Sequence, residues 1–407
     1  MDRELAARYS DVILKTGIDV QPGQPVLIRT EVAHRAMAEA LSRRAYELGS
    51  SYVHVIYSDR RLERARLESS SAGHLGYVPS FTRHLYGIFV EENWASISLT
   101  GSENPDELEG QDPSRQGAVR KAAAAAARDW LAAVSSNAIR WNVCLDPTPL
   151  WAAKVMGSQR DWERRIWKLL TPILRLDRED PARAWLDHDA ELKRKAGILN
   201  SARFDHFHFV GPGTDLRVGM SGDRVFSGGR CRARDGRLFF PNIPTEEIFS
   251  TPDCRRTEGV VRCTRPVEVN GTNVEDAWFR FESGRVAAHG ASRNAAALDQ
   301  FLSTDEGAVM IGEIALVGCD SPIYRSGRTF HSILFDENAS SHIALGNGYT
   351  ECVEGSAGLG EDALRALGCN VSLVHTDFMI GSEAVDVDGV DASGGRVPVM
   401  RKGMFVI

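Results

Sequence analysis

The stretch PVLIRTEVAHRAMAEALSRRAYELGSSYVHVIYS, residues 25–58, decides the fold of the first part of the chain. PVLIRT is a short apolar run and SYVHVIYS is rich in β-branched and aromatic residues, so each predicts a strand. Between them, apolar residues recur at the spacing of one helical face. These residues are Met37, Leu41, Ala45 and Leu48. A strand, a helix and a second strand in this order imply a crossover connection, and therefore a parallel sheet.

Strands and helices continue to alternate after this unit. The runs 94–101 and 139–146 predict strands, and the alanine-rich segment 114–136 between them predicts a helix. A further amphipathic helix is expected over 160–176, although Pro172 should kink it or end it. This alternation predicts an N-terminal α/β domain with a parallel sheet.

The second half of the chain has a different pattern. Beyond residue 200, short β-rich runs are separated by Gly, Asn and Asp turns, which indicates a mainly antiparallel α+β domain. A charged segment, DREDPARAWLDHDAELKRKAG, lies between the two halves. We therefore expect two domains, residues 1–190 and residues 191–407.

The composition excludes several classes of protein. The chain has 407 residues, 43% of them apolar and 25% charged, and a formal net charge of −7. This is typical of a globular protein, and the acidic balance argues against a nucleic acid or an anionic membrane as partner. The N-terminus lacks the features of a secretory signal and the seven cysteines form no C-x-x-C pair, so we expect a cytoplasmic protein. No G-x-G-x-x-G follows a predicted strand, so the first domain has no visible dinucleotide site.

Isolated acids and histidines stand out against the apolar strands of the second half. In NVSLVHTDFMIG a strand would point His375 and Asp377 to the same face, about 7 Å apart, where they could bind a metal ion or pair with each other. Glu313 interrupts the run VMIGEIALVG, where a carboxylate must meet a cation or donors unless it is exposed. His206 and His208 also share a strand face, but no carboxylate of similar context lies beside them.

Two further segments have both a chemical and a purely structural interpretation. In NIPTEEIFSTPD, Glu246 and Glu247 could be first-turn acids of a helix that Thr245 caps. In DENASSHIALGNGY, His342 lies on a predicted strand seven residues before Tyr349. Taken alone, such a histidine is better explained as a hydrogen-bonded core residue than as a ligand.

Together, four segments resemble the M29 metallopeptidase family, the aminopeptidase T and aminopeptidase S group. The segments are NIPTEEIFSTPD, IGEIALVG, LFDENASSHIALG with the following Tyr349, and HTDFMIGS. In the first domain, YSDVILKTGIDVQPGQPVLI and NPDELEGQDP are similar as well. Because separate motifs occur in the same order, the resemblance is more specific than any one of them.

The resemblance implies a role for each of these residues. The implied metal ligands are Glu247, Glu313, His342, His375 and Asp377, and the implied active-site tyrosine is Tyr349. Five protein ligands are one more than the four that close a structural zinc site, so they fit two divalent ions that share a carboxylate. By resemblance the ions are zinc or cobalt, and the second domain is the metal-binding one. The family further implies a homodimer that acts on peptides with a free N-terminus.

Two other functions remain open at this point. His342, His375 and one carboxylate could form the facial triad of a mononuclear iron oxygenase that cleaves rings. A non-catalytic binding protein is the other alternative, although it would have no use for a full set of ligands. The role of Glu246, as a general base or as a helix-start acid, is also open.

Overall fold

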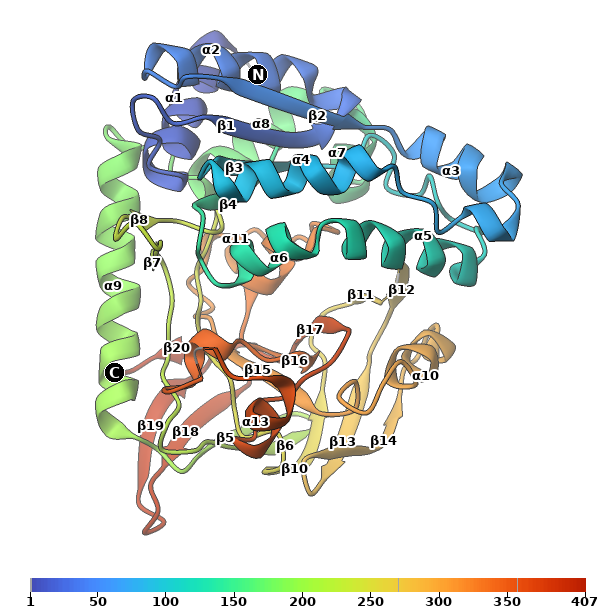
Figure 1. Cartoon of the computed structure of the whole chain (residues 1–407). Helices are drawn as coiled ribbons and strands as arrows, with labels where there is room; N and C mark the ends of the chain where they lie inside the picture. Colours follow the sequence, from blue (N-terminus) through green and yellow to red (C-terminus); the bar gives the residue numbers. More distant parts are fainter. Residues whose placement is uncertain (1, 270, 357) are drawn as a thin grey trace. The chain divides into compact units, whose positions relative to one another are not determined.

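The computed structural model describes residues 2–269, 271–356 and 358–407 (Figure 1). These residues form two compact units. The first unit runs to Leu186 and includes Arg230–Pro244, and the second comprises Asp187–Gly229 and Thr245–Ile407. The domains 1–190 and 191–407 remain a prediction from the sequence.

The first unit is built on a parallel sheet, as predicted. The strand order is β2-β1-β3-β4, and each neighbouring pair is parallel. The strands are β1 (Val26–Glu31), β2 (Val53–Ser58), β3 (Ala95–Thr100) and β4 (Trp141–Leu145). Between β1 and β2 lies α2 (Arg35–Glu47), which buries Met37, Leu41 and Ala45. The strand, helix and strand predicted over residues 25–58 are thus confirmed.

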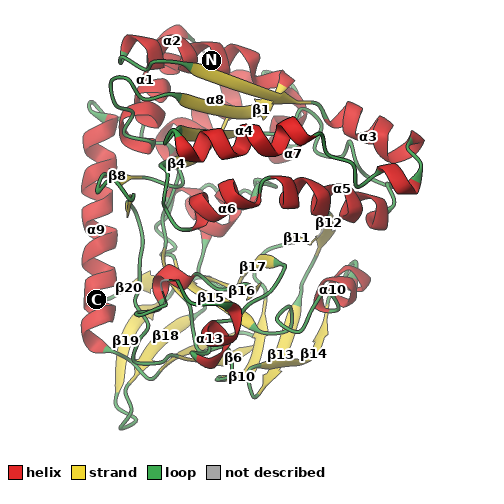
Figure 2. Ribbon diagram, in the orientation of Figure 1, coloured by secondary structure: helices red, strands yellow, loops and turns green. Residues whose placement is uncertain are grey.

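Helices cover both faces of this sheet (Figures 1 and 2). On one face, Phe89 of α4 (Ser80–Glu91) and Trp130 of α6 (Arg128–Ser135) belong to one apolar cluster with Leu27 of β1. In Figure 1, α1 and α2 lie on the other face. The remaining helices of this unit are α1 (Arg3–Asp11), α3 (Arg60–Ser69), α5 (Pro113–Ala126), α7 (Pro149–Met156) and α8 (Trp162–Ile173).

The helices differ from the sequence prediction in three details. The segment 114–136 is divided into α5 and α6 at Ala127, whose φ of −98° and ψ of 10° leave the helical region. Helix α8 ends one residue after Pro172, in line with the missing N–H of proline. The charged segment after residue 176, for which no element was predicted, forms α9 (Pro181–Ala202). A proline at the first helical position already has a compatible φ.

Among the described residues, the second unit contains two antiparallel sheets of four or more strands. The larger sheet has the order β14-β13-β10-β6-β5-β18-β19-β20, and the smaller one has the order β17-β16-β15-β9. The pairings are antiparallel, as predicted for this half of the chain.

The bounds of these elements are as follows. The larger sheet comprises β5 (His206–Gly211), β6 (Thr214–Gly219), β10 (Thr257–Arg262), β13 (Trp278–Glu282), β14 (Arg285–Gly290), β18 (Asp386–Val390), β19 (Arg396–Arg401) and β20 (Met404–Phe405). The smaller sheet comprises β9 (Ile248–Ser250), β15 (Ile311–Leu316), β16 (His342–Gly346) and β17 (His375–Met379). A short pair of this unit is β11 (Val267–Val269) with β12 (Thr272–Val274), and a short pair of the first unit is β7 (Cys231–Arg232) with β8 (Leu238–Phe239). The helices are α10 (Ala295–Leu302), α11 (Pro322–Arg325), α12 (Ile333–Asp336) and α13 (Glu361–Ala366).

The core of the second unit lies between its two sheets. The rings of Phe378 on β17 and Phe279 on β13 meet at a centroid distance of 4.8 Å, and both belong to one buried cluster. The smaller sheet therefore turns one face to this core and leaves the other face for polar side chains. Among the described residues, no helix is long and apolar enough to cross a membrane.

Candidate metal centre

The smaller sheet of the second unit sends the predicted ligands to one face. Its core-facing residues are Ile314, Leu316, Ile343, Leu345 and Phe378. Successive side chains of a strand point to opposite faces, so His342, His375 and Asp377 point away from the core. His375 and Asp377 thus lie on the same face of the sheet, as their spacing predicts.

A β-bulge brings Glu313 to the same face. Ile311 pairs with Leu345 and Glu313 pairs with Ala344, so two residues of β15 span one step of β16. Ile311 belongs to the core, and the extra residue turns Glu313 away from it. A Cβ on the intervening Gly312 would lie 2.3 Å from two backbone carbonyl oxygens, so only glycine fits there. The bulge explains how a glutamate can interrupt an apolar strand without facing the core.

The two neighbouring glutamates of NIPTEEIFSTPD have different partners. The alternative in which they begin a helix is wrong, because the chain continues into strand β9. Ile248 of β9 faces the core, so Glu247 points to the face that carries the histidines. The carboxylate of Glu246 instead lies 3.3 Å from His188 Nε2. The backbone N–H of Glu246 donates to Asn338 Oδ1 at 2.7 Å.

The five predicted ligands form two overlapping groups. In one group, Glu247, Glu313 and His342 offer ligand atoms within 4.8 Å of one another. In the other, Glu313, His375 and Asp377 do the same. His342 Nε2 lies 3.4 Å from Glu247 Oε2, while His375 Nε2 lies 3.2 Å from Glu313 Oε2 and 3.3 Å from Asp377 Oδ1. Glu313 belongs to both groups.

Both histidines are oriented with Nε2 towards the carboxylates. His342 Nδ1 lies 3.2 Å from the carbonyl oxygen of Ser340, and His375 Nδ1 lies 2.7 Å from that of Asn347. Because a carbonyl oxygen only accepts, each Nδ1 must carry the proton. A neutral imidazole would then turn its Nε2 lone pair towards anionic oxygens. That arrangement is stable only if Nε2 is also protonated or if a cation lies between the two groups.

The carboxylates of this cluster lack enough donors. Within the described residues, Glu247 Oε2 and Asp377 Oδ1 are buried and accept no hydrogen bond. Burial raises the pKa of Glu247 to about 8, with contributions from the Glu313 and Asp377 charges and against the opposing effect of His342. Burial lowers the pKa of His375, but the charges of Asp377 and Glu313 outweigh it and raise that pKa well above its ordinary value. Divalent cations would satisfy the uncompensated oxygens, so the residues present fit a metal site.

Glu337, which the sequence analysis did not single out, interacts electrostatically with the carboxylates of the cluster but belongs to neither group of ligand atoms. Burial raises its pKa well above the ordinary value, and the next contributions come from Glu247, Asp377 and Glu313. Asn338 Nδ2 donates to its Oε1 at 3.2 Å. A sequence signal for Glu337 is present in LFDENAS, where two acids lie inside an apolar segment.

Tyr349 lies at the exposed side of the cluster. Its hydroxyl is 3.4 Å from His375 Nε2, and the residue is 39% exposed. Desolvation and the nearby carboxylates, Glu313 and Asp377 foremost, raise the pKa of Tyr349 well above its ordinary value. The phenol is therefore neutral and can donate a hydrogen bond.

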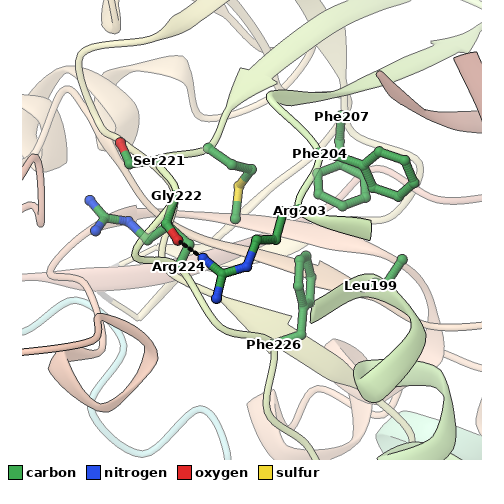
Figure 3. A pocket seen from close by; sticks show the side chains of 9 residues that line it. Leu199, Arg203, Phe204, Phe207, Ser221, Gly222, Arg224 and Phe226 are labelled. Atoms are coloured by element: carbon green, nitrogen blue, oxygen red, sulfur yellow. Dashed lines mark hydrogen bonds between the residues drawn. The ribbon is translucent and has the colours of Figure 1, made fainter. Parts of the chain in front are cut away.

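The other candidates of the second unit lie outside these two groups. His208 Nε2 is 2.7 Å from Asp215 Oδ1, and His206 Nδ1 is 3.0 Å from Asp205 Oδ2, so each histidine has its own carboxylate partner. Figure 3 shows a pocket beside Phe207 and Phe226, whose cavity of about 20 Å³ has room for roughly one water molecule. Since none of the candidate ligands lines this pocket, it is not part of the metal centre.

Comparison with known proteins gives consistent matches over almost the whole chain. The sequence matches the family described as thermophilic metalloprotease (M29) over residues 2–405. It is 39% identical to aminopeptidase T of Thermus aquaticus over 402 residues, which is 98% of each chain. It is 36% identical to aminopeptidase PepS of Streptococcus thermophilus over 408 residues, covering 100% of this chain and 98% of the relative. The structure of wild-type AmpT from Thermus thermophilus superposes with a TM-score of 0.93 at 37% identity and covers 100% of both chains.

Proposed function

Because this chain belongs to the M29 family of metallopeptidases and is a metallo-aminopeptidase, we propose that it hydrolyses the N-terminal bond of peptides with two divalent ions. The proposed ligands are Glu247, Glu313, His342, His375 and Asp377. The observation that carries this proposal is that the two groups of ligand atoms overlap in Glu313. A pair of ions with a shared carboxylate is typical of two-metal hydrolases, and zinc or cobalt is the proposed metal.

When bound, the ions would polarise the scissile carbonyl and lower the pKa of a water molecule. Side chains of the protein would bind the substrate and stabilise the charge that develops on it. The neutral hydroxyl of Tyr349 is suited to donate a hydrogen bond to the carbonyl oxygen as its negative charge develops. When present, the ions could also bind the neutral α-amine of a peptide, which would favour substrates with a free N-terminus.

Glu337 adds one more carboxylate to the proposed site. The substitution Glu337→Gln distinguishes two possible roles of this carboxylate, as a metal ligand or as a proton acceptor, because it keeps the shape of the side chain and removes its charge. A ligand role predicts a loss of bound metal. A role as acceptor of the proton from water predicts a lower kcat with the metal content unchanged.

One experiment tests the proposed function directly. The metal content per chain is measured, and free and N-acetylated di- and tripeptide amides are then assayed with added zinc or cobalt. We expect two ions per chain and cleavage of the free peptides only. Equal cleavage of the blocked peptides would contradict an aminopeptidase. One iron per chain without peptide cleavage would favour the ring-cleaving oxygenase. The absence of both peptide cleavage and ring cleavage would favour a non-catalytic binding protein.

Homodimer formation and a cytoplasmic location are further proposals, and both rest on the family resemblance and the composition of the chain. Sedimentation at several protein concentrations tests the first. The location of a tagged chain in fractionated cells tests the second.

A further inference from the structure

Thr251, one residue beyond β9, holds the backbone of Tyr349. Its Oγ1 accepts a hydrogen bond from the N–H of Tyr349 at 2.8 Å and donates one to the carbonyl oxygen of Tyr349 at 2.9 Å. Thr251 is fully buried. The carbonyl oxygen of Tyr349 also accepts from the N–H of Cys352 at 3.1 Å. The Thr251 hydroxyl therefore bonds to both backbone polar groups of Tyr349 and is the acceptor for its N–H.

Phe249, on β9 itself, packs against the ring of the same tyrosine. The two rings meet edge to face, with a centroid distance of 5.3 Å and an interplanar angle of 62°. The backbone of Phe249 is fixed in turn by two hydrogen bonds with Ser227, at 2.8 and 2.9 Å. The ring of Tyr349 also lies 5.1 Å from that of His375. The segment 249–251, which follows Glu247 closely in the chain, thus contacts both the backbone and the ring of Tyr349.

Gly348 allows the two segments to approach this closely. A Cβ at this position would lie 2.9 Å from Thr251 Cγ2. The N–H of Gly348 donates to the carbonyl oxygen of Asn370 at 2.9 Å, so the loop is tied down on this side as well. The contact between the loop and β9 therefore leaves no space for a side chain.

We propose that Thr251 and Phe249 are positioning residues that hold the Tyr349 hydroxyl beside the ligand cluster. The inference rests on the proposed function, which makes this hydroxyl a donor to the developing oxyanion. Such a donor is effective only about 2.7–3.1 Å from that oxygen, so its orientation must be restricted. Since Tyr349 is 39% exposed, core packing does not enclose it, and the Thr251 and Phe249 contacts supply the restriction.

A matched pair of variants tests the role of Thr251. Thr251→Val keeps the shape and removes both hydrogen bonds, whereas Thr251→Ser keeps the hydroxyl. A lost oxyanion donor costs about 10²- to 10³-fold in kcat, and we expect Thr251→Val to lose about tenfold or more of it. Thr251→Ser should stay within about twofold of the wild type, and neither variant should change KM for a free dipeptide amide or the metal content.

A double-mutant cycle separates positioning from a general loss of structure. In a Tyr349→Phe background the hydroxyl is gone, so Thr251→Val should have almost no further effect on kcat. An equal fold-loss in both backgrounds would overturn the inference, as would a wild-type kcat in Thr251→Val. If Tyr349→Phe itself keeps the wild-type kcat, the proposed donor role of Tyr349 is wrong. If Tyr349→Phe loses kcat but Thr251→Val does not, only the positioning role of Thr251 is wrong.

Hydrogen–deuterium exchange supplies a readout that does not depend on activity. The amide of Tyr349 should exchange faster in Thr251→Val than in Thr251→Ser, because its acceptor is lost. If Thr251→Val does not fold, Phe249→Leu replaces it in the cycle, since it removes only the ring contact. Unchanged exchange in Thr251→Val, or an additive effect of Phe249→Leu, would contradict the proposed positioning.

Discussion

Glu313→Gln is the most informative single change, because Glu313 belongs to both groups of candidate ligands. The substitution keeps the volume of a side chain that is 3% exposed and removes only its charge. We expect the variant to fold, to lose most of its bound metal and to lose peptide hydrolysis. The change thus separates the stability of the metal-free protein from the stability that metal adds.

The expected magnitudes follow from the geometry. With an effective dielectric constant of about 20, His375 at 3.2 Å attracts Glu313 by about 5 kcal/mol. At 4.8 Å, the limit within each group, one pair of charges contributes about 3.5 kcal/mol. When all four neighbours are charged, the repulsions from Glu247 and Asp377 total about 7 kcal/mol and the attractions to His375 and a protonated His342 total about 8.5 kcal/mol, so the attractions prevail by only about 1.5 kcal/mol. Glu313→Gln should therefore change the stability of the metal-free protein by only about 2 kcal/mol.

The metal-bound protein should respond much more strongly. Loss of a residue that merely supports a ligand weakens metal binding about 10- to 100-fold, so loss of a shared ligand should weaken it by about 100-fold or more. Metal at 1,000 times its Kd adds about 4.1 kcal/mol of stability, and after a 100-fold loss of affinity it adds only about 1.4 kcal/mol.

Urea unfolding with and without zinc or cobalt, followed by circular dichroism, measures both quantities, and the metal content after dialysis is measured beside it. Glu246→Gln is the matched control, because this neighbouring buried carboxylate pairs with His188 and belongs to neither group of ligands. We expect the control to keep its metal. The reasoning is refuted if Glu313→Gln retains both ions and the full stabilisation by metal, or if the control loses as much metal as Glu313→Gln does.

Three further predictions address other parts of the chain. Tyr349→Phe should lower kcat about 10²-fold with the metal content unchanged, and full activity would remove the hydroxyl from the reaction. Gly312→Ala should destabilise the protein by about 3 kcal/mol in urea and lower metal binding, because its Cβ would meet the backbone 2.3 Å away; a wild-type urea midpoint would argue against this. Burial lowers the pKa of His34, but hydrogen bonding to Asp146, its charge and the Gly101 carbonyl outweigh this and raise the pKa above 6.5. The stabilisation by protonated His34 is fully present below pH 6.5 and is lost as the pH rises through the pKa of His34 in the folded protein. His34→Gln should therefore lower the free energy of unfolding more at about pH 5.5 than at about pH 9. An equal cost at both pH values would contradict this prediction.

Local pattern was sufficient for most strands and for the faces of regular ones. The period of two that placed His375 and Asp377 on one face depends only on strand geometry, and it holds in β17. The apolar periodicity of residues 25–58 was similarly sufficient for a crossover unit, because a buried helix face and two buried strands leave a local signature. The helix α9 was missed because its charged residues hide the apolar stripe of Trp185, Leu192 and Leu199.

The sequence by itself determined the two kinds of sheet, the residue types of the candidate centre and, through the order of its motifs, the family. Only the tertiary structure decided which acids meet. The bulge beside Gly312 turns Glu313 out of the core, the residues before β9 send Glu246 and Glu247 to different partners, and Glu337, on the short 3-10 helix Glu337–Ala339, interacts with the same carboxylates. The physical reason is that ligand atoms are brought within a few ångströms by pairing between strands far apart in the chain. That pairing depends on the core the strands share, which no local spacing of residues records.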